Sequence, residues 1–449
     1  MAMSDHGVGS GGRLSVLSEA DLERLDAAAL DVLATVGVSI PSAAAQAALV
    51  VAGAHADGAR VTLTPGLVRE LVARAPRRLR LGGRAAPTLV TGERSLLTTD
   101  GCCVEIYDLD SGEKRGTVAD DVVAITRLVD GMDEVDFVWP AVSAQDRLAA
   151  TRGLHELYLT LANTGKHVQT VTVVEPKAAA VATEMARAVA GGDARLRAEP
   201  PVSALLGTVT PLGNDPGTLE AGLAFAAAGI PIGFVTMPMG GSTTPITMAG
   251  SLVVAIAEAL SAVAMIQAAH PGAPVFICFI PSIMDLKTGD FTGGAPEDTL
   301  MGAAVGDVGH FYGLPTQCGV NSSGAKLPCW QSALDDVTTT FLSMAAGVDM
   351  LTGVGMVSGG RVFSLQEVVL AAEIAAQART IMAGIPLGGR PLVAAASLAD
   401  GWADVESPSH GRGAPEERAT TRVRELQRTH EPPVLDESLD AELRRLVGD

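Results

Sequence analysis

The chain has 449 residues, 47% of them hydrophobic and 18% charged, which is enough to bury a sizeable core. Its 32 Lys and Arg residues against 51 Asp and Glu residues give a net charge of −19, which disfavours binding to nucleic acid or to an anionic membrane. The five cysteines form no Cys-x-x-Cys pair, and the N-terminus has no apolar signal segment. Both features are typical of a cytoplasmic protein with free thiols.

The N-terminal part of the chain is predicted to lie outside the main domain. Residues 1–14 are expected to be a disordered tail, and residues 15–94 a helical and β-rich extension. Ser18 is a candidate N-cap for an amphipathic helix that continues to about Val36. Further short helices are predicted at 41–54 and 65–74, followed by a β-rich segment at 78–108.

From about residue 95, strand-like and helix-like runs alternate. The strand-like runs are 95–99, 135–142, 168–174, 202–208, 232–237, 275–280, 316–320 and 350–354. The helix-like runs are 119–130, 147–161, 176–189, 216–228, 247–269, 297–311, 331–346 and 365–383. This alternation predicts parallel βα units of the α/β class, and eight strands within residues 95–385 match a (β/α)8 TIM barrel. A doubly wound open sheet is the alternative, but no Gly-x-Gly-x-x-Gly follows any strand.

Two remaining segments complete the organisation. The apolar run 248–269 contains Glu258 and other polar residues, which favours a buried helix over a membrane span. Residues 386–449 are predicted to form a C-terminal extension outside the barrel, with helices at 415–427 and 439–446.

In a barrel of this kind the active site is built at the carboxyl ends of the strands. The side chains expected there are mostly hydroxyls, sulfurs and amides, with few carboxylates: Asp100, Gln169, Thr208, Met237, Phe279, Ser282, Asn321 and Lys326. The chain has no nucleophile elbow, P-loop, His-Glu-x-x-His helix or zinc-ligand spacing, so no metal site is predicted. His167 lies near a strand and is interpreted as a hydrogen-bonded structural residue.

Such a site suits a substrate that needs positioning more than proton transfer. A quaternary ammonium has no proton to lose, and it binds aromatic faces and carboxylates. Asp100 could contact the cation or hold the Asp-Gly turn. Lys326 could form a Schiff base, as in barrel aldolases, or could cap a loop or pair with Asp335. Trp330 and Phe279 are the preferred cage residues, with ordinary packing as the alternative, among the candidates Trp139, Phe279, Phe311, Tyr312, Trp330 and Phe363.

Several motifs over residues 15–440 resemble one family. They are Thr99-Asp100-Gly101, Asn163-Thr164-Gly165-Lys166-His167, Thr210-Pro211-Leu212, Met237-Pro238-Met239-Gly240-Gly241, Pro281-Ser282-Ile283-Met284-Asp285, Tyr312-Gly313-Leu314-Pro315, and Lys326-Leu327-Pro328 with Gln331. On these residues the chain resembles the trimethylamine methyltransferase (MttB) family.

The resemblance implies a TIM barrel that moves a methyl group from a methylated amine to the Co(I) centre of a separate corrinoid protein, in one-carbon metabolism. The corrinoid partner would supply the only cofactor, and the chain is expected to form a homo-oligomer. Trimethylamine-specific members insert pyrrolysine, whereas this sequence has only standard residues. It therefore resembles the non-pyrrolysine branch, which acts on quaternary amines such as glycine betaine.

One loop departs from the family pattern Ser-Asp-Ser-Lys-x-Pro-Asp-x-Gln. Here it reads Ser323-Gly324-Ala325-Lys326-Leu327-Pro328-Cys329-Trp330-Gln331, without either carboxylate. A paralogue that binds a quaternary amine without transferring its methyl group is therefore one alternative, and a Lys326 Schiff-base lyase is another. We assign catalytic roles to Asp100, Asn321 and Lys326. Substrate contacts are assigned to Gln169, Thr208, Met237, Phe279, Ser282, Trp330 and Gln331.

Overall fold

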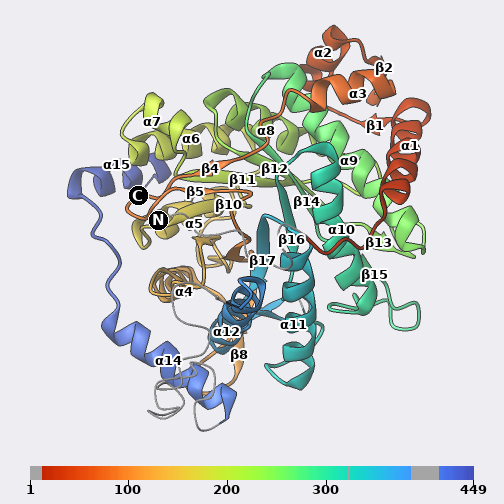
Figure 1. Cartoon of the computed structure of the whole chain (residues 1–449). Helices are drawn as coiled ribbons and strands as arrows, with labels where there is room; N and C mark the ends of the chain where they lie inside the picture. The colour runs from red at the N-terminus through yellow and green to blue at the C-terminus, as the bar shows by residue number, and fades with distance from the viewer. Residues whose placement is uncertain (1–12, 322, 386–413, 449) are drawn as a thin grey trace, which may run out of the picture.

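The protein folds around a closed barrel of eight parallel strands, seen in the computed structural model, which describes residues 13–321, 323–385 and 414–448 (Figure 1). Neighbouring strands follow one another in chain order and the last pairs with the first. The strands are β6 (Leu96–Thr99), β9 (Phe137–Val138), β10 (His167–Thr170), β11 (Val202–Gly207), β12 (Ile232–Thr236), β14 (Val275–Phe279), β16 (Thr316–Gly319) and β17 (Met350–Val354). The predicted TIM barrel is confirmed, and the open sheet is ruled out.

A helix follows each barrel strand and covers the outside of the barrel. These helices are α4 (Ala119–Asp130), α5 (Arg152–Ala162), α6 (Pro176–Ala190) with the short α7 (Asp193–Ala198), α8 (Pro216–Ala228), α9 (Met248–Ala269), α10 (Pro296–Tyr312), α11 (Trp330–Ala345) and α12 (Leu365–Met382). Local sequence sets several boundaries, because Asp215, Thr247 and Ser364 cap their helices through side-chain oxygens. By length and composition α9 could cross a membrane, but most of it is buried in the fold, as predicted.

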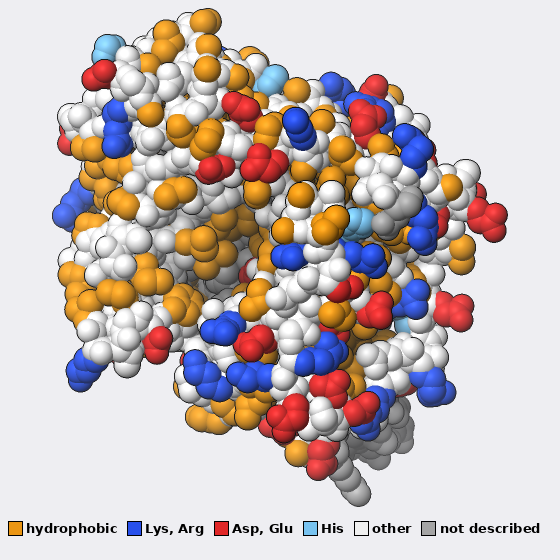
Figure 2. All heavy atoms as spheres, turned by 180° about the vertical axis from the view of Figure 1, so that it is seen from behind, with side chains coloured by type: hydrophobic (Ala, Val, Ile, Leu, Met, Phe, Trp, Pro, Cys, Tyr) orange, Lys and Arg blue, Asp and Glu red, His pale blue; other side chains and the backbone are white. Residues whose placement is uncertain are grey.

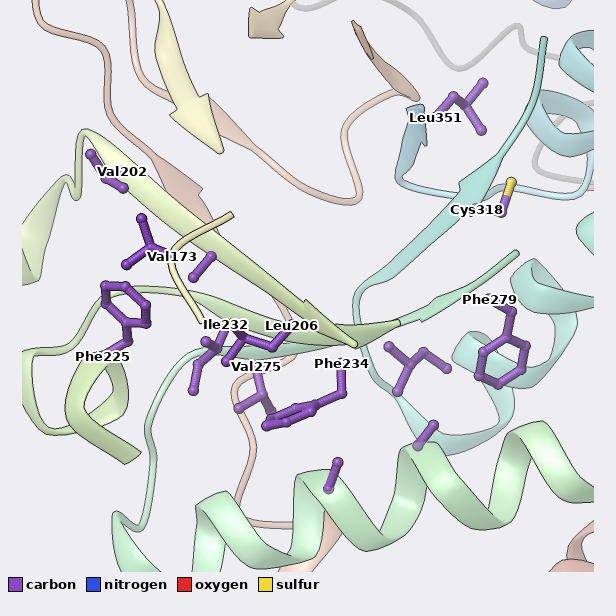
Figure 3. Packing of buried hydrophobic residues seen from close by; sticks show 14 of the residues in the cluster. Val173, Val202, Leu206, Phe225, Ile232, Phe234, Val275, Phe279, Cys318 and Leu351 are labelled. Atoms are coloured by element: carbon purple, nitrogen blue, oxygen red, sulfur yellow. The ribbon is translucent and has the colours of Figure 1, made fainter. Parts of the chain in front are cut away.

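Strand residues alternate between two separate hydrophobic clusters. In β14, Ile277 and Phe279 pack with the helix layer, whereas Phe276 and Cys278 belong to a second cluster. Figure 3 shows Leu206, Phe234 and Phe279 among the residues between strands and helices. The second cluster fills the barrel interior, because side chains alternate across a strand. It contains Leu96, Phe137, Trp139, Leu205, Val235, Phe276, Cys278 and Met350, with Val171 and Ile280 packed against it.

A hairpin closes the end of the barrel at which the strands begin. It consists of β4 (Arg80–Leu81) and β5 (Leu89–Val90), and its leucines Leu79 and Leu81 join the interior cluster. The Gly82 amide donates to the Pro200 carbonyl oxygen just before β11. The interior is therefore sealed at this end, and access is left to the end at which the strands finish.

The N-terminal extension packs on the outside of α9. It contains α1 (Glu19–Thr35), β1 (Val38–Ser39), α2 (Ala43–Ala52), β2 (His55–Asp57), β3 (Arg60–Thr62) and α3 (Pro65–Val72). Ser18 forms the predicted N-cap of α1. Most of the expected disordered tail lies outside the described residues. Its last two residues are ordered, contrary to prediction, because Arg13 pairs with Asp307 and the Leu14 amide donates to the Ala345 carbonyl oxygen.

Within residues 414–448, the C-terminal extension follows the barrel exterior in two helices, both close to their predicted bounds. α14 (Pro415–Thr429) packs on α12 and α4, and α15 (Glu437–Val447) packs on α5 and α6 (Figure 1). Arg84 donates to the Pro433 and Val434 carbonyl oxygens of the connecting arm. Besides the β4–β5 hairpin and the β1–β3–β2 sheet of the N-terminal extension, the described strands outside the barrel form two more sheets. One contains β18 (Met356–Val357), β19 (Val362–Phe363), β7 (Glu105–Tyr107) and β8 (Lys114–Gly116), and the other pairs β13 (Met239–Gly240) with β15 (Ser282–Ile283).

Candidate active site at the carboxyl ends of the barrel strands

Asp100 is a buried carboxyl group at the end of β6. It alternates with Leu96 and Thr98 on the face of the strand that points into the barrel, and it is only 5% exposed. The Gly101 amide donates to its Oδ1 at 2.8 Å. Burial raises the pKa of Asp100 to about 7, against the opposing hydrogen bonds from Gly101 and Thr352. Asp100 therefore passes between neutral and anionic forms near neutral pH.

The walls around this end of the interior are largely apolar. Trp139 follows β9, is 2% exposed and belongs to the interior cluster with Val171, Cys278 and Ile280. Its Nε1–H has no hydrogen-bond partner among the described residues. Seen from behind the view of Figure 1, the molecular surface has a hollow bordered by hydrophobic side chains (Figure 2). The apolar side chains of the interior cluster exclude water and strengthen electrostatic contacts with any ion bound there.

Two buried glutamates fix the loops that leave neighbouring strands. Glu156 on α5 accepts from the Ala144 amide after β9, at 2.9 Å, and from the Thr172 hydroxyl after β10, at 2.8 Å. Glu258 on α9 accepts from Thr208 and Thr210 after β11. Burial raises the pKa of both glutamates. Thr208, a predicted substrate contact, thus holds its loop in place.

Gln169 lies deep in the interior rather than at its mouth. Its Nε2 donates to the Ser203 hydroxyl at 3.2 Å, and its Oε1 accepts from Gln317 at 2.9 Å. The His167 ring bonds the same Ser203 hydroxyl and faces the Gly82 carbonyl oxygen. Burial lowers the pKa of His167 to about 4, so the ring is neutral. This agrees with a structural His167, and it makes Gln169 part of the same internal network.

Three other predicted site residues, Asn321, Ser282 and Met237, lie in different surroundings near the strand ends. Asn321 is fully buried after β16, and its Oδ1 accepts from the Thr340 hydroxyl of α11 while its Nδ2 has no partner among the described residues. Ser282 is buried in β15, with its hydroxyl 3.3 Å from that of Thr292. Met237 follows β12 and is 54% exposed. Of these, Asn321 offers a buried polar group for a ligand.

The structure overturns Phe279 as a cage residue. Phe279 is fully buried in the cluster between strands and helices, on the opposite face of β14 from Cys278 (Figure 3). A substrate in the barrel interior cannot reach it. This orientation could not be predicted, because the whole run Val275–Phe279 is apolar, as in a parallel strand that is buried on both faces.

In the loop that departs from the family pattern, Ser323 and Ala325 are buried, and the part from Lys326 to Gln331 lies at the surface. Trp330 is 81% exposed, and Lys326 and Gln331 are exposed as well. Trp330 therefore does not enclose a ligand in this conformation, and Lys326 lacks the desolvation that a Schiff-base lysine requires. Asp335 accepts from Ser323 at 2.6 Å rather than pairing with Lys326.

The cysteine thiols of the interior are not reactive as nucleophiles. Burial raises the pKa of Cys102 to about 12 and that of Cys278 well above its ordinary value, so both thiols are protonated and poor nucleophiles. Among the residues that the structure describes, no three His, Cys, Asp or Glu side chains gather as a metal site. The arrangement can bind and orient a ligand beside one carboxyl group, but it offers no nucleophile.

Trp139, Glu156 and Glu258 are part of the site, but the predictions from the sequence do not single them out. Trp139 is only one of six aromatic candidates, Glu156 is not among the predicted site residues, and Glu258 is interpreted only as a sign of a buried helix. The signal for Glu258 was available, because it is the only charged residue in the apolar helix 248–269. Nothing local to Trp139 distinguished it from the other aromatic residues.

The comparisons with known proteins agree with this architecture. The model of the trimethylamine methyltransferase (MTTB) family matches residues 6–410. A trimethylamine methyltransferase of Desulfitobacterium hafniense is 31% identical over 376 residues, covering 83% of this chain and 76% of the relative. A glycine betaine methyltransferase of the same species is 24% identical over 97% of each chain. The monomethylamine methyltransferase of Methanosarcina barkeri, 12% identical, shares the fold with a TM-score of 0.57 over 97% of this chain and 88% of that one.

Proposed function

Because this chain belongs to the trimethylamine methyltransferase family, we propose that it transfers a methyl group from a quaternary amine of the glycine betaine kind to the cobalt of a separate corrinoid protein. The similarity to a glycine betaine methyltransferase over 97% of both chains supports this substrate class. The observation that carries the proposal is Asp100, a carboxyl group buried at the strand ends in an apolar interior.

The chemistry needs little from the protein beyond orientation and electrostatics. A bound corrinoid in its Co(I) state supplies the nucleophile for the methyl carbon, and the nitrogen keeps the electron pair of the broken bond and leaves as a neutral amine. No proton has to move, which fits an interior whose thiols and imidazole are neutral. Asp100 in its anionic form would bind the cationic nitrogen, and the apolar walls would exclude water.

A binding protein without transfer activity is the second candidate. The supporting observation is the loop 323–331, which lacks both family carboxylates, at Gly324 and Cys329. If that loop normally contributes to transfer, this chain could retain the amine site and lack the reaction.

The test is to mix the purified protein with a corrinoid protein reduced to Co(I) and with glycine betaine, choline, trimethylamine or carnitine. We expect the Co(I) absorbance to fall and methylated corrinoid to accumulate with one quaternary amine. Asp100→Asn should slow this transfer, whereas Asp290→Asn, which alters an exposed carboxylate, should not. Tight amine binding without methylation of any corrinoid tested would favour the binding protein.

A further inference from the structure

The apolar interior contains an aromatic ring and a carboxyl group on neighbouring strands. β6 and β9 pair directly, and Asp100 and Trp139 follow their respective ends. Trp139 belongs to the interior cluster, and Asp100 lies on the inward face of β6. The two side chains are therefore directed to the same end of the barrel interior.

The surroundings of Gly101, the residue after Asp100, show how closely this segment approaches Trp139. A Cβ atom added to Gly101, next to Asp100, would lie 3.6 Å from Cε3 of Trp139 and 3.0 Å from Cγ2 of Val171. The backbone that carries Asp100 thus runs against the Trp139 ring. Glycine at position 101 permits this approach, because a Cβ atom there would lie only 2.9 Å from the Pro140 carbonyl oxygen and would crowd Val171.

Free space lies on another wall of the same interior. Gly207, the last residue of β11, pairs with Val235 of the interior cluster, so its missing side chain would point inward. A Cβ atom at Gly207 would meet no atom within 4 Å. In addition, the buried Trp139 Nε1–H has no acceptor among the described residues. A buried donor without a protein acceptor is unfavourable, and an acceptor oxygen of a bound molecule would satisfy it.

We propose that Asp100 and Trp139 form a binding pocket for the trimethylammonium group of a betaine, with the space beside Gly207 accommodating its methyl groups. This inference rests on the proposed function and names the residues that recognise its substrate. A cation binds an aromatic face most strongly where water is excluded, and the buried carboxylate provides the opposite charge. The carboxylate arm of a betaine could accept from the Trp139 N–H. Trp139, rather than the exposed Trp330, is then the aromatic residue that discriminates substrates.

The experiment is calorimetric titration of the free protein with glycine betaine and with 3,3-dimethylbutanoate, in which carbon replaces the charged nitrogen. The two ligands have the same shape, so the difference in affinity measures the charge. We expect 3,3-dimethylbutanoate, whose tert-butyl group is uncharged, to bind at least about tenfold more weakly than glycine betaine. Equal affinities would overturn the pocket.

Variants assign the residues. Trp139→Leu should weaken betaine binding by about 3-fold to 30-fold, while Trp139→Phe, which keeps a ring, should lose less. Gly207→Val should fold, because it enters open space, and should weaken binding by filling that space. Trp330→Leu is the matched control and should bind as wild type. Thermal unfolding verifies that each variant is folded.

The outcomes separate this inference from the proposed function. If Trp139→Leu and Trp139→Phe are folded and bind betaine as tightly as Trp330→Leu, the pocket is wrong even where the wild type transfers methyl groups. If the variants show the expected order of affinities but no corrinoid protein is methylated, the pocket stands and the transfer reaction is wrong.

Discussion

The carboxylate of Glu258, midway along α9, accepts a hydrogen bond of 2.7 Å from the hydroxyl of Thr208, the first residue after β11. It also accepts from the Thr210 hydroxyl at 2.9 Å and from the Leu212 amide at 2.7 Å. One acid in an otherwise apolar helix thereby fixes the loop 208–212 beside Gly207. Glu258 is a positioning residue, since it reaches the proposed pocket only through this loop.

Glu258→Ala should therefore loosen the loop and lower stability. Three hydrogen-bond donors lose a buried acceptor, which costs about 1–3 kcal/mol in the free energy of unfolding. Glu258→Gln keeps one acceptor oxygen and should cost less. Denaturant unfolding measures stability, and betaine titration should show weaker binding for Ala than for Gln. The exposed Glu184→Gln is the control, and equal stability of Glu258→Ala and wild type would contradict the role.

Betaine binding should depend on pH through Asp100. Its pKa of about 7 means that the anion, the form that attracts a cation, predominates only above pH 7. We expect affinity to fall roughly tenfold per pH unit below 7 and to level off above about pH 8. Titrations between pH 5.5 and 8.5 measure this dependence.

Asp100→Asn is the control for that pH dependence and should remove it. The other titratable groups that influence this region are the thiols of Cys102, Cys103 and Cys278, whose raised pKa values keep them neutral over this range, and the Glu156 carboxyl group. A pH dependence that survives in Asp100→Asn would assign it to Glu156 instead.

Stability should fall as the pH rises because of two neighbouring buried carboxyl groups, Asp336 and Glu367. Asp336 on α11 and Glu367 on α12 are both buried, and the Asp336 oxygens have no other partner among the described residues. Burial, then the neighbouring Glu367, raises the pKa of Asp336, and burial raises that of Glu367. A carboxyl group whose pKa is higher in the folded than in the unfolded chain makes its full contribution to stability at acidic pH. This contribution is lost as the pH rises through the pKa of the folded state.

Asp336→Asn should make this loss of stability less steep. The new amide can donate to the Glu367 carboxylate, so the pair no longer needs a shared proton between two carboxyl groups. We expect the variant to be more stable than wild type by about 1–3 kcal/mol at pH 9 and close to it at pH 5. Denaturant unfolding at both values measures the difference, with the exposed Glu93→Gln as control. Parallel pH profiles for variant and wild type would refute the shared proton.

Lys166 should matter for stability and leave substrate binding unchanged. Its Nζ donates to the carbonyl oxygens of Val129, Met132 and Val135, at 2.8, 2.6 and 2.6 Å, in the last turn of α4 and just after it. Lys166→Met removes this shared donor; the Val129 and Met132 oxygens keep the weak bonds from the Met132 and Val135 amides, and the free energy of unfolding should fall by about 1–3 kcal/mol. Betaine affinity should not change, because Lys166 precedes β10, at the far end of the barrel. The exposed Lys177→Met is the control.

Much of the fold could be predicted because it depends on local patterns. Apolar runs such as Ile232–Thr236 are bounded by Pro or Gly, and amphipathic or Ala-rich runs such as Pro216–Ala228 begin at capping residues. Eight such repeats favour a barrel, because right-handed crossovers let consecutive parallel strands lie side by side in chain order. Only the structure shows that the sheet closes. Asp100 could also be found, as a carboxylate directly after a strand.

The direction in which each side chain points was decided only by the tertiary structure. Phe279 and Trp139 both lie at strand ends, yet Phe279 faces the helices and Trp139 faces the interior. Strands buried on both faces show no polar alternation, so the register cannot be determined from an apolar run. Likewise, only the folded chain shows that Trp330 stays on the surface and that Glu258 reaches Thr208, since these contacts depend on how distant elements pack.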